Sequence, residues 1–232
     1  MNLATVFLLF GGLGLFLYGM KLMSEGLEKA AGAKMRGILE LFTKNRFIGM
    51  VVGILFTGIV QSSSATTVMV VSFVNSGLMI LQQASGVILG ANIGTTVTGQ
   101  LIAFDLSEIA PLFVITGVVM VMFSKRMNIK KIGEIVLGFG ILFMGLSIMG
   151  DSMTSFKDSP YVIDFLRTLR NPVLAILAGF VITAVLQSSS ATVGVIILMA
   201  SQGLLEFGIC PFLILGCNMG SCVSALLASL GG

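Results

Sequence analysis

The chain has little charge and no histidine. Only 10% of its 232 residues are charged, whereas a soluble globular domain carries roughly a quarter. The absence of histidine argues against a transition-metal site and against a histidine proton relay. The three cysteines, Cys210, Cys217 and Cys222, form no CxxC pair, so we interpret them as small packing residues.

Apolar residues dominate the composition. They make up 56% of the chain, and the mean hydropathy is +1.07. Twenty-nine glycines against four prolines suit closely packed membrane helices. We therefore predict one integral membrane domain over residues 1–232, embedded in the lipid bilayer. Leu3–Met20 is preceded by no basic residues and followed by no clear cleavage site, so we interpret it as a retained first helix rather than a signal peptide.

A polar hexapeptide, Gln-Ser-Ser-Ser-Ala-Thr, occurs twice inside this apolar sequence, at Gln61–Thr66 and at Gln187–Thr192. Hydroxyl and amide groups are costly to bury in hydrocarbon, so such a cluster indicates a function. The two copies lie 126 residues apart. An internal repeat of this kind is typical of a transporter whose site lies between its repeats. We assign repeat one to about residues 3–124 and repeat two to about residues 131–232.

Other features keep the same offset. From Gly53 to Leu101, about 17 of 49 positions are identical to the residues 126 further on, by direct count. Further matching pairs are Gly12 with Gly138, Gly19 with Gly145, Asn45 with Asn171, and the segment Gly90–Thr95 with Gly216–Ser221. The repeat therefore extends well beyond the hexapeptide.

Hydropathy divides the chain into helical segments. A spanning helix needs roughly 20 apolar residues. The segments predicted to span are Leu3–Met23, Met79–Phe104, Ile109–Phe123, Ile132–Met149 and Leu204–Leu230. Ser24–Arg46 is charged and amphipathic and is predicted to lie at the membrane interface, and Asp151–Asn171 is predicted to be a polar connector.

The two hexapeptides divide Phe47–Asn75 and Pro172–Ser201 into arms that are too short to span alone. Two short arms that meet at a polar break predict a re-entrant helical hairpin, which enters and leaves on one side. One broken spanning helix is the alternative. The segment Gly90–Thr96 and its repeat partner predict interruptions in two of the spanning helices.

The number of crossings predicts how the repeats are related. Repeat one contains three spanning helices, and an odd number means that repeat two enters the bilayer upside down. The predicted fold class is an all-α membrane protein, an inverted-repeat transporter with two re-entrant helical hairpins and two interrupted transmembrane helices. Repeat two has no counterpart of Ile109–Phe123, so that helix is either dispensable or follows Gly232.

The basic residues predict the orientation. An outside N-terminus places Lys21–Arg46 and Lys125–Lys131 inside, and these segments hold ten of the 13 Lys and Arg residues. This agrees with the positive-inside rule. We predict a multi-pass protein of the plasma membrane, with both hairpin tips near the midplane. Lys125–Lys131 is interpreted as a topology determinant, so no nucleic-acid partner is expected.

Each polar break is predicted to place the N-terminus of a half-helix inside the membrane. Unpaired N–H groups and the helix dipole favour an anion there, and serine is a natural N-cap. Two facing tips would suit a tetrahedral oxyanion, which accepts several hydrogen bonds. The candidate phosphate ligands are Gln61, Ser62, Ser63, Ser64, Thr66, Gln187, Ser188, Ser189, Ser190 and Thr192. The alternative is that these hydroxyls only hold helices together.

Along the sequence, no Lys or Arg is near either tip, because Arg46 and Arg170 are the nearest. A multiply charged anion in a low dielectric needs accompanying cations, which predicts bound sodium as the coupling ion and no organic cofactor. Sodium prefers oxygen ligands, including the carbonyls of unwound helix. The candidate sodium ligands are Asn92, Thr95, Thr96, Asn218 and Ser221. The alternative is that the glycine-rich segments are sites of close packing.

The paired QSSS motifs, followed by GANIGTT at Gly90–Thr96, resemble those of the sodium/phosphate cotransporter type II family and its bacterial relatives. The resemblance covers Gly12–Leu230. It implies sodium-coupled uptake of phosphate, with the serine tips holding the anion and the GANIGTT-like segments matched more loosely. Cys217 and Cys222 depart from the GANIGTT pattern in repeat two, and Val193 stands in the position of Thr67.

The function expected is therefore symport of sodium and inorganic phosphate by alternating access. A channel for anions, a transporter of another oxyanion and a membrane phosphate sensor are the alternatives. An intramembrane enzyme is not expected, because no His or Lys lies near the serines in the sequence to act as a base.

Overall fold

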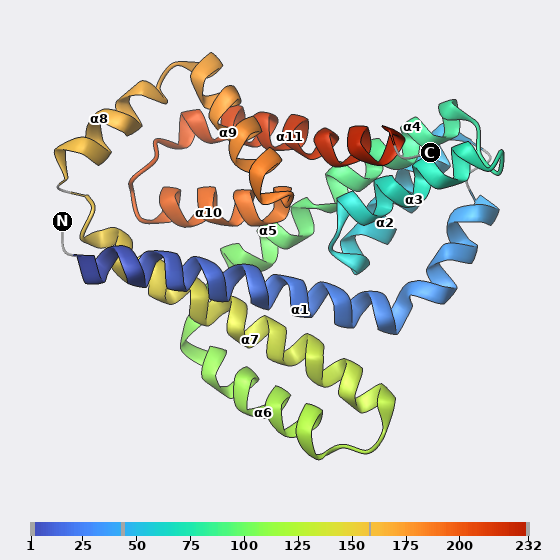
Figure 1. Ribbon diagram of the computed structural model, residues 1–232, viewed down its shortest axis with the longest axis horizontal. Coiled ribbons are helices and arrows are strands. Elements are labelled where there is room, and N and C mark those ends of the chain that lie inside the picture. The colour runs from blue at the N-terminus through green and yellow to red at the C-terminus, as the bar shows by residue number, and fades with distance from the viewer. Residues whose placement is uncertain (1–2, 43–44, 158, 231–232) are drawn as a thin grey trace.

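The computed structural model describes residues 3–42, 45–157 and 159–230, and it contains only helices within them (Figure 1). The helices are α1 (Leu3–Phe42), α2 (Arg46–Val60), α3 (Ser63–Asn75), α4 (Leu81–Gly94), α5 (Thr96–Ala103), α6 (Ala110–Phe123), α7 (Met127–Thr154), α8 (Pro160–Thr168), α9 (Pro172–Leu186), α10 (Ser189–Ser201) and α11 (Cys210–Leu230). Short 3-10 turns, η1 (Ser107–Ile109) and η2 (Phe207–Ile209), precede α6 and α11. The prediction of an all-α protein is confirmed.

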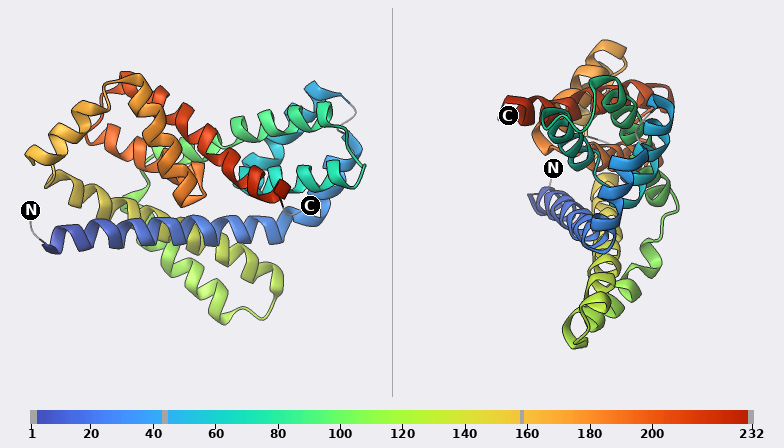
Figure 2. Two further views of the ribbon diagram at one scale, coloured as in Figure 1. Left: turned by 45° about the horizontal axis from the view of Figure 1, so that its top comes forward. Right: turned by 90° about the vertical axis from the view of Figure 1, so that its right-hand side faces the viewer.

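Within the residues that the structure describes, four stretches of helix are long and apolar enough to cross a membrane. They are Leu3–Ala30, Leu81–Ala103, Met127–Thr154 and Phe207–Leu227. The pair α8 and α9, bent by 107°, would make a fifth if it crossed as one span. The segment predicted to span at Ile109–Phe123 does form a helix, but α6 has only 14 residues and falls short of the required length. It packs on α7 and projects from the rest of the molecule (Figure 2).

The segment predicted to lie at the membrane interface, Ser24–Arg46, is helical as far as Phe42, since α1 continues from Leu3 to Phe42. Salt bridges of Glu25 with Lys21 and Lys29 follow the i,i+4 spacing that supports a helix. Lys29 also lies 2.9 Å from Glu134 and so ties this part of α1 to α7. Lys44, at the end of the predicted segment, lies outside the described residues.

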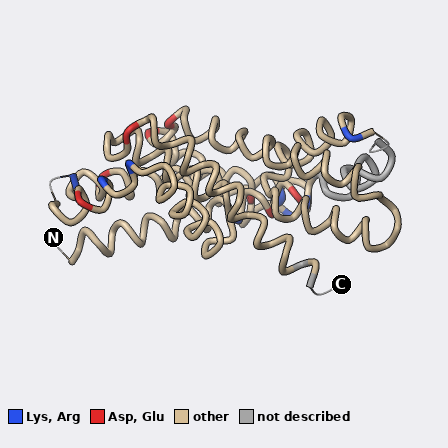
Figure 3. The backbone as a smooth tube through the Cα atoms, turned by 90° about the horizontal axis from the view of Figure 1, so that it is seen from above, with Lys and Arg blue, Asp and Glu red and all other residues tan. Residues whose placement is uncertain are grey.

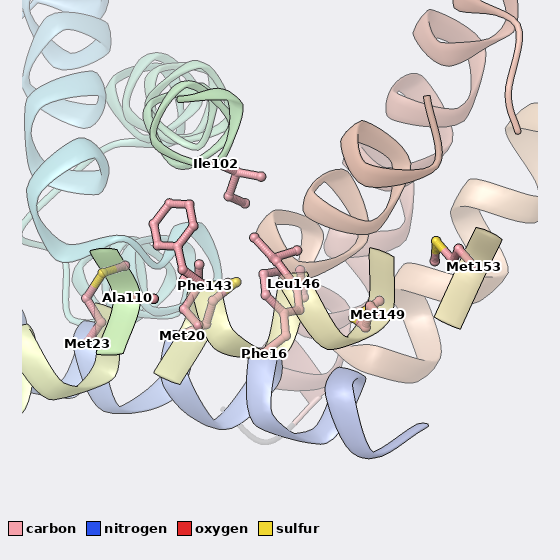
Figure 4. Close-up of a cluster of buried hydrophobic side chains, with 11 residues drawn as sticks. Phe16, Met20, Met23, Ile102, Ala110, Phe143, Leu146, Met149 and Met153 are labelled. Atoms are coloured by element: carbon pink, nitrogen blue, oxygen red, sulfur yellow. The ribbon is translucent and has the colours of Figure 1, made fainter. Parts of the chain in front are cut away.

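Glycines bring α1 and α7 together. A Cβ added to Gly12 would lie 2.9 Å from the carbonyl oxygen of Gly145, and one added to Gly19 would lie 2.7 Å from that of Gly138. The residue numbers of the contacting glycines rise along α1 as they fall along α7, so the two helices are antiparallel. Buried Phe16, Phe143 and their neighbours fill the interface (Figure 4).

The contacts of the two repeats match at the offset of 126 residues. Gly12 and Gly19 on α1 correspond to Gly138 and Gly145 on α7, so the α1–α7 contact pairs each helix with its own counterpart. The α2–α4 contact recurs as α9–α11. Added Cβ atoms at Gly53 and Gly179 would lie 2.2 and 2.1 Å from the carbonyl oxygens of Val87 and Leu213.

The segments broken by the hexapeptides form helical arms, as predicted. Repeat one provides α2 and α3, and repeat two provides α9 and α10. Each second arm packs across the repeat boundary, because α3 contacts α11 and α10 contacts α5. Both breaks face the middle of the molecule (Figure 1). The repeats are thus interleaved rather than placed side by side.

The two predicted interruptions have different outcomes. The first spanning helix is divided at Thr95 into α4 and α5, inside the predicted Gly90–Thr96, although the φ and ψ of Thr95, −60° and −24°, are helical. The interruption predicted in repeat two is wrong, because α11 is continuous through Gly216–Ser221. The glycines serve close packing instead: added Cβ atoms at Gly90 and Gly216 would lie 2.0 and 2.1 Å from the carbonyl oxygens of Met50 and Ile176. The alternative of close-packing sites is therefore the one that fits the backbone.

The predicted polar connector Asp151–Asn171 also contains helix. Its first residues end α7, and α8 begins at Pro160, where proline suits the first turn of a helix. Charged residues are few along the coloured part of the backbone and leave long uncharged stretches (Figure 3). The connector is therefore polar but not irregular.

The glycine contacts predict that the same substitution destabilises the protein at one position of α1 and not at another. Gly19→Ala should lower the free energy of unfolding by about 1–3 kcal/mol, because the added methyl group would lie 2.4 Å from the backbone nitrogen of Leu142. Gly14→Ala is the matched control, since Gly14 has no heavy atom within 4 Å of an added Cβ. Thermal unfolding in detergent micelles measures both. Equal melting temperatures for the two variants would contradict this account of the α1–α7 interface.

Candidate functional site

Each hexapeptide begins with a glutamine in a left-handed backbone conformation. Gln61 has φ 61° and Gln187 has φ 53°, and their N–H groups donate to Thr57 and Thr183 at 2.7 Å. A non-glycine residue in this region is uncommon and is held by its surroundings. The chain is thereby turned out of the first helical arm at the same point in both repeats.

The glutamine side chains stabilise the break. The Nε2 of Gln61 donates to the carbonyl of Gly58, and its Oε1 accepts from Thr98 on α5 at 2.5 Å. In repeat two, Gln187 donates to Ala184 and accepts from Ser224 on α11 at 2.6 Å. Both predicted phosphate ligands therefore cap the preceding arm and bind it to the neighbouring helix.

The next serine caps the second arm. Ser62 and Ser188 have extended backbones, and their Oγ atoms accept from the N–H groups of Ala65 and Ala191 at 3.2 and 3.3 Å. This is the N-cap arrangement expected for serine. Each cap satisfies one of the donors that a helix start leaves unpaired.

The threonines of the hexapeptides hold the two arms together. The Oγ1 atoms of Thr57 and Thr66 lie 2.8 Å apart, and those of Thr183 and Thr192 lie 3.0 Å apart. Thr66 and Thr192 also donate to the carbonyls of Ser62 and Ser188. These hydroxyls are fully or almost fully buried. The predicted ligands Thr66 and Thr192 thus pair within their own hairpins.

The two tips meet at equivalent residues. The Oγ of Ser63 lies 3.5 Å from the Oγ of Ser189, its counterpart 126 residues on, and both serines are buried. Within the described residues, no acceptor contacts the N–H groups that open the second arms, those of Ser63, Ser64, Ser189 and Ser190. Unpaired N–H groups at two helix starts therefore lie on either side of one serine contact, and such groups favour an anion.

A cavity of about 380 Å³ opens beside both tips. Gln61, Ser62 and Ser188 line one side of it, and Lys21, Glu25 and Glu28 of α1 line the other, with Ser24 between them. The Oγ of Ser24 lies 3.5 Å from the carbonyl oxygen of Gln61. The interpretation of Arg46 and Arg170 as the nearest basic residues is therefore wrong in three dimensions, because Lys21 shares a cavity with both capping serines.

The predicted sodium ligands lie on the helices that support the hairpins. Asn92 and Asn218 are half-buried on α4 and α11. Thr95 and Ser221 donate to the carbonyls of Ala91 and Asn218 within their own helices, and Thr96 donates likewise to Ile93. The carbonyls expected to be unwound are in helical backbone. Thr98 on α5 does contact a tip, through its hydrogen bond to Gln61, and the sequence interpretation did not include it.

The threonines and the serine that contact the hexapeptides were missed by the sequence analysis, although the repeat offset could have indicated them. Thr57 and Thr183 are identical at the repeat offset, and Thr98 and Ser224 both carry a hydroxyl there. Lys21 and Glu28 carried no such signal, since their equivalents are Ser147 and Thr154, without charge, whereas Glu25 corresponds to the carboxylate of Asp151. The location of these α1 residues beside the tips depends on tertiary packing alone.

The fold and the site together define the class of protein to which the chain belongs. The chain is a multi-pass helical membrane protein with duplicated, serine-capped helix breaks that face each other. The Na+/Pi-cotransporter family matches residues 15–151 and 162–231. The chain belongs to this family, which is a family of transporters and not of enzymes.

Individual relatives cover different shares of the chain. YqeW of Bacillus subtilis (strain 168), an uncharacterized protein, is 32% identical over 220 residues, which is 94% of this chain and 71% of YqeW. The "putative inorganic phosphate export protein YjbB" of Escherichia coli (strain K12) is 28% identical over 224 residues, 96% of this chain and 41% of YjbB. Sodium-dependent phosphate transport protein 2A of Rattus norvegicus is 41% identical over 107 residues, 44% of this chain and 16% of that protein. The chain thus spans less than half of YjbB.

No solved structure matches the chain. The arrangement of its breaks therefore rests on the contacts described above.

The glutamine bridges predict an energetic coupling that differs between the repeats. A double-mutant cycle of Gln61→Ala and Thr98→Val should give a coupling of about 1 kcal/mol, because the hydrogen bond between them is buried. The matched cycle of Gln187→Ala and Ser224→Ala should give less, since Gln187 is exposed while Gln61 is 6% exposed. Thermal unfolding of the purified protein measures both. A coupling near zero at Gln61 would contradict the bridge.

Proposed function

We propose that the chain is a sodium-coupled symporter of inorganic phosphate in the plasma membrane and that it works by alternating access. The observation that carries the proposal is the contact of the two serine tips, with four unpaired N–H groups beside it. The printed names of YjbB and of transport protein 2A link this family to phosphate, and the second links it to sodium.

The serines are the proposed phosphate ligands. Ser63, Ser64, Ser189 and Ser190 offer both a hydroxyl and an unpaired N–H group, and charge-assisted hydrogen bonds of this kind to an oxyanion are strong. Ser62 and Ser188 keep a free hydroxyl proton while they cap, and they line the adjoining cavity. We assign Gln61, Gln187, Thr66 and Thr192 the task of holding the tips in position for phosphate.

Sodium would balance the charge of the anion. No basic side chain contacts the serine pair in the described residues, and helix dipoles alone compensate a divalent anion only in part. Asn92, Thr95, Thr96, Asn218 and Ser221 stay the proposed sodium ligands, through side-chain oxygens rather than unwound carbonyls. The support for them is their location on the helices that press against the hairpins.

The repeats are proposed to be inverted across the membrane. Helices α1 and α7 are repeat partners and run antiparallel, so the operation that relates them is a rotation about an axis perpendicular to both. If both helices cross the bilayer, this axis lies in the membrane plane. The hairpins would then be re-entrant from opposite faces, and an exchange of conformation between the repeats would expose the site to each side in turn. The N-terminus is proposed to lie outside.

The tip contact predicts the loss of transport on removal of one hydroxyl. Ser63→Ala or Ser189→Ala should lower the initial rate of phosphate uptake by about 10-fold or more, since a charged hydrogen bond contributes roughly 1.5–3 kcal/mol. Radiolabelled phosphate uptake into proteoliposomes with an inward sodium gradient measures this. Ser72→Ala is the matched control, because the hydroxyl of Ser72 donates to Val68 on the same helix, away from the tip.

The same assay separates the alternatives. Wild-type uptake in both tip variants would contradict the binding site. Flux that persists when potassium replaces sodium would favour an anion channel, and binding without flux would favour a phosphate sensor. Efflux in place of uptake under the same gradient would assign the direction that the name of YjbB states for that protein.

The sodium proposal has its own test. Thr95→Val should raise the sodium concentration for half-maximal uptake by several-fold, because it removes a buried oxygen without changing the volume of the side chain. Thr116→Val is the control, since Thr116 is exposed on α6 and donates to its own helix. The measurement is uptake as a function of sodium at fixed phosphate. An unchanged sodium dependence would remove Thr95 from the set of ligands.

A further inference from the structure

We propose that Lys21 captures the phosphate anion at one mouth of the transport path and that the opposite mouth has no equivalent cation. This inference rests on the proposed function and adds to it a residue outside both hexapeptides. It follows from the cavity that joins α1 to the tips, from the weak partner of Lys21 and from the difference between the repeats at this position.

The cavity places a cation beside the capping serines. Lys21 lines it together with Ser62 and Ser188, one from each repeat, and each of these directly precedes the unpaired N–H groups of its tip. The side chain of Lys21 is 71% exposed, so protein does not bury its ammonium group where it lies at the cavity. An anion that enters here meets this charge before it reaches the unpaired N–H groups of the tips.

The present partner of Lys21 is easily replaced. Its Nζ lies 3.8 Å from Glu25, which is also 3.9 Å from Lys29. Exposed pairs of this kind contribute roughly 0–1 kcal/mol, so an oxyanion in the cavity can take over Lys21 at little energetic cost. Lys29 cannot serve in the same way, because it is hydrogen-bonded to Glu134 on α7 at 2.9 Å.

The mouth also suits the accompanying cation. Glu25 and Glu28 line the cavity with Lys21, so two carboxylates face one ammonium group. A mouth with this balance attracts a monovalent cation and still offers one direct partner to an anion. Both transported ions of the proposed symporter would therefore gather at the same opening.

Repeat two lacks the ammonium group of this arrangement. Ser147 stands at the position of Lys21 and Thr154 at that of Glu28, while Asp151 keeps a carboxylate at the position of Glu25. Capture by a lysine is therefore built into one side of a molecule whose tips are otherwise duplicated. The affinity for phosphate should differ between the two faces of the membrane, and Lys21 should be the cause.

The test compares the two faces. The initial rate of radiolabelled phosphate transport by the full chain is measured as a function of phosphate in right-side-out and in inside-out vesicles. For Lys21→Gln, we expect KM to rise about threefold to tenfold from the face onto which the α1 cavity opens, which is the effect of one charge at close range in a high effective dielectric. We expect kcat to be unchanged, and KM from the other face to be unchanged.

Further variants separate capture from a structural role. Lys21→Arg should restore the wild-type KM, and Glu25→Gln should lower KM from the same face because it frees the ammonium group. Raising the ionic strength should raise KM of the wild type more than that of Lys21→Gln. Lys125→Gln removes an equal charge from a residue that does not line the cavity, and it should leave KM unchanged.

Two results would overturn the proposal: an unchanged KM in Lys21→Gln, or an equal change from both faces. Equilibrium binding of radiolabelled phosphate to the purified protein gives a second readout that does not need transport, and there Lys21→Gln should weaken binding by the same factor. Failure of the proposed function is distinguishable. In that case Ser63→Ala would transport phosphate like the wild type, whatever the effect of Lys21→Gln.

Discussion

A helix that breaks inside a membrane leaves backbone groups for which hydrocarbon offers no partner, so protein must surround the break. The structure meets this requirement with the same contacts in both repeats. The glutamine ends the first arm, the serine caps the second, and a hydroxyl from the supporting helix binds the glutamine. Thr98 and Ser224 can reach because Gly94 and Gly220, one turn earlier, allow contact with the hairpin backbone. Close packing by glycine thus makes the polar break possible.

The sequence predicted a large part of this arrangement. The two hexapeptides marked the breaks, and the arms extend close to the predicted limits, since α2 begins at Arg46 and α10 ends at Ser201. The meaning of Gly90–Thr96 was not decided by the sequence, because glycine both permits unwinding and permits close approach. Which of the two applies depends on the backbone opposite, and Met50 and Ile176 are remote in the chain from the glycines that they contact.

The sequence predicted the serine tips of the site but not the α1 residues beside them. The serines of the two tips share a composition and an offset, and the structure brings Ser63 to Ser189. The α1 residues share nothing with the hexapeptides in spacing or in type. Their approach to the tips depends on the continuation of α1 past Met23, where the change from apolar to charged sequence indicated a boundary. The charged part of α1 is stabilised by contacts such as that of Lys29 with Glu134, and Glu134 lies on α7, a helix far along the chain.

The contact between Ser63 and Ser189 has one more property. When two repeats exchange conformations, a contact between residues a and b in one state becomes a contact between their counterparts in the other. The packing of α3 on α11 is therefore replaced by that of α10 on the α4–α5 helix, and differences between the two are reversed. A contact of a residue with its own counterpart is converted into itself. Under the proposed alternating access, the serine pair would be a fixed point of the exchange, because each tip would keep the same neighbour in both states.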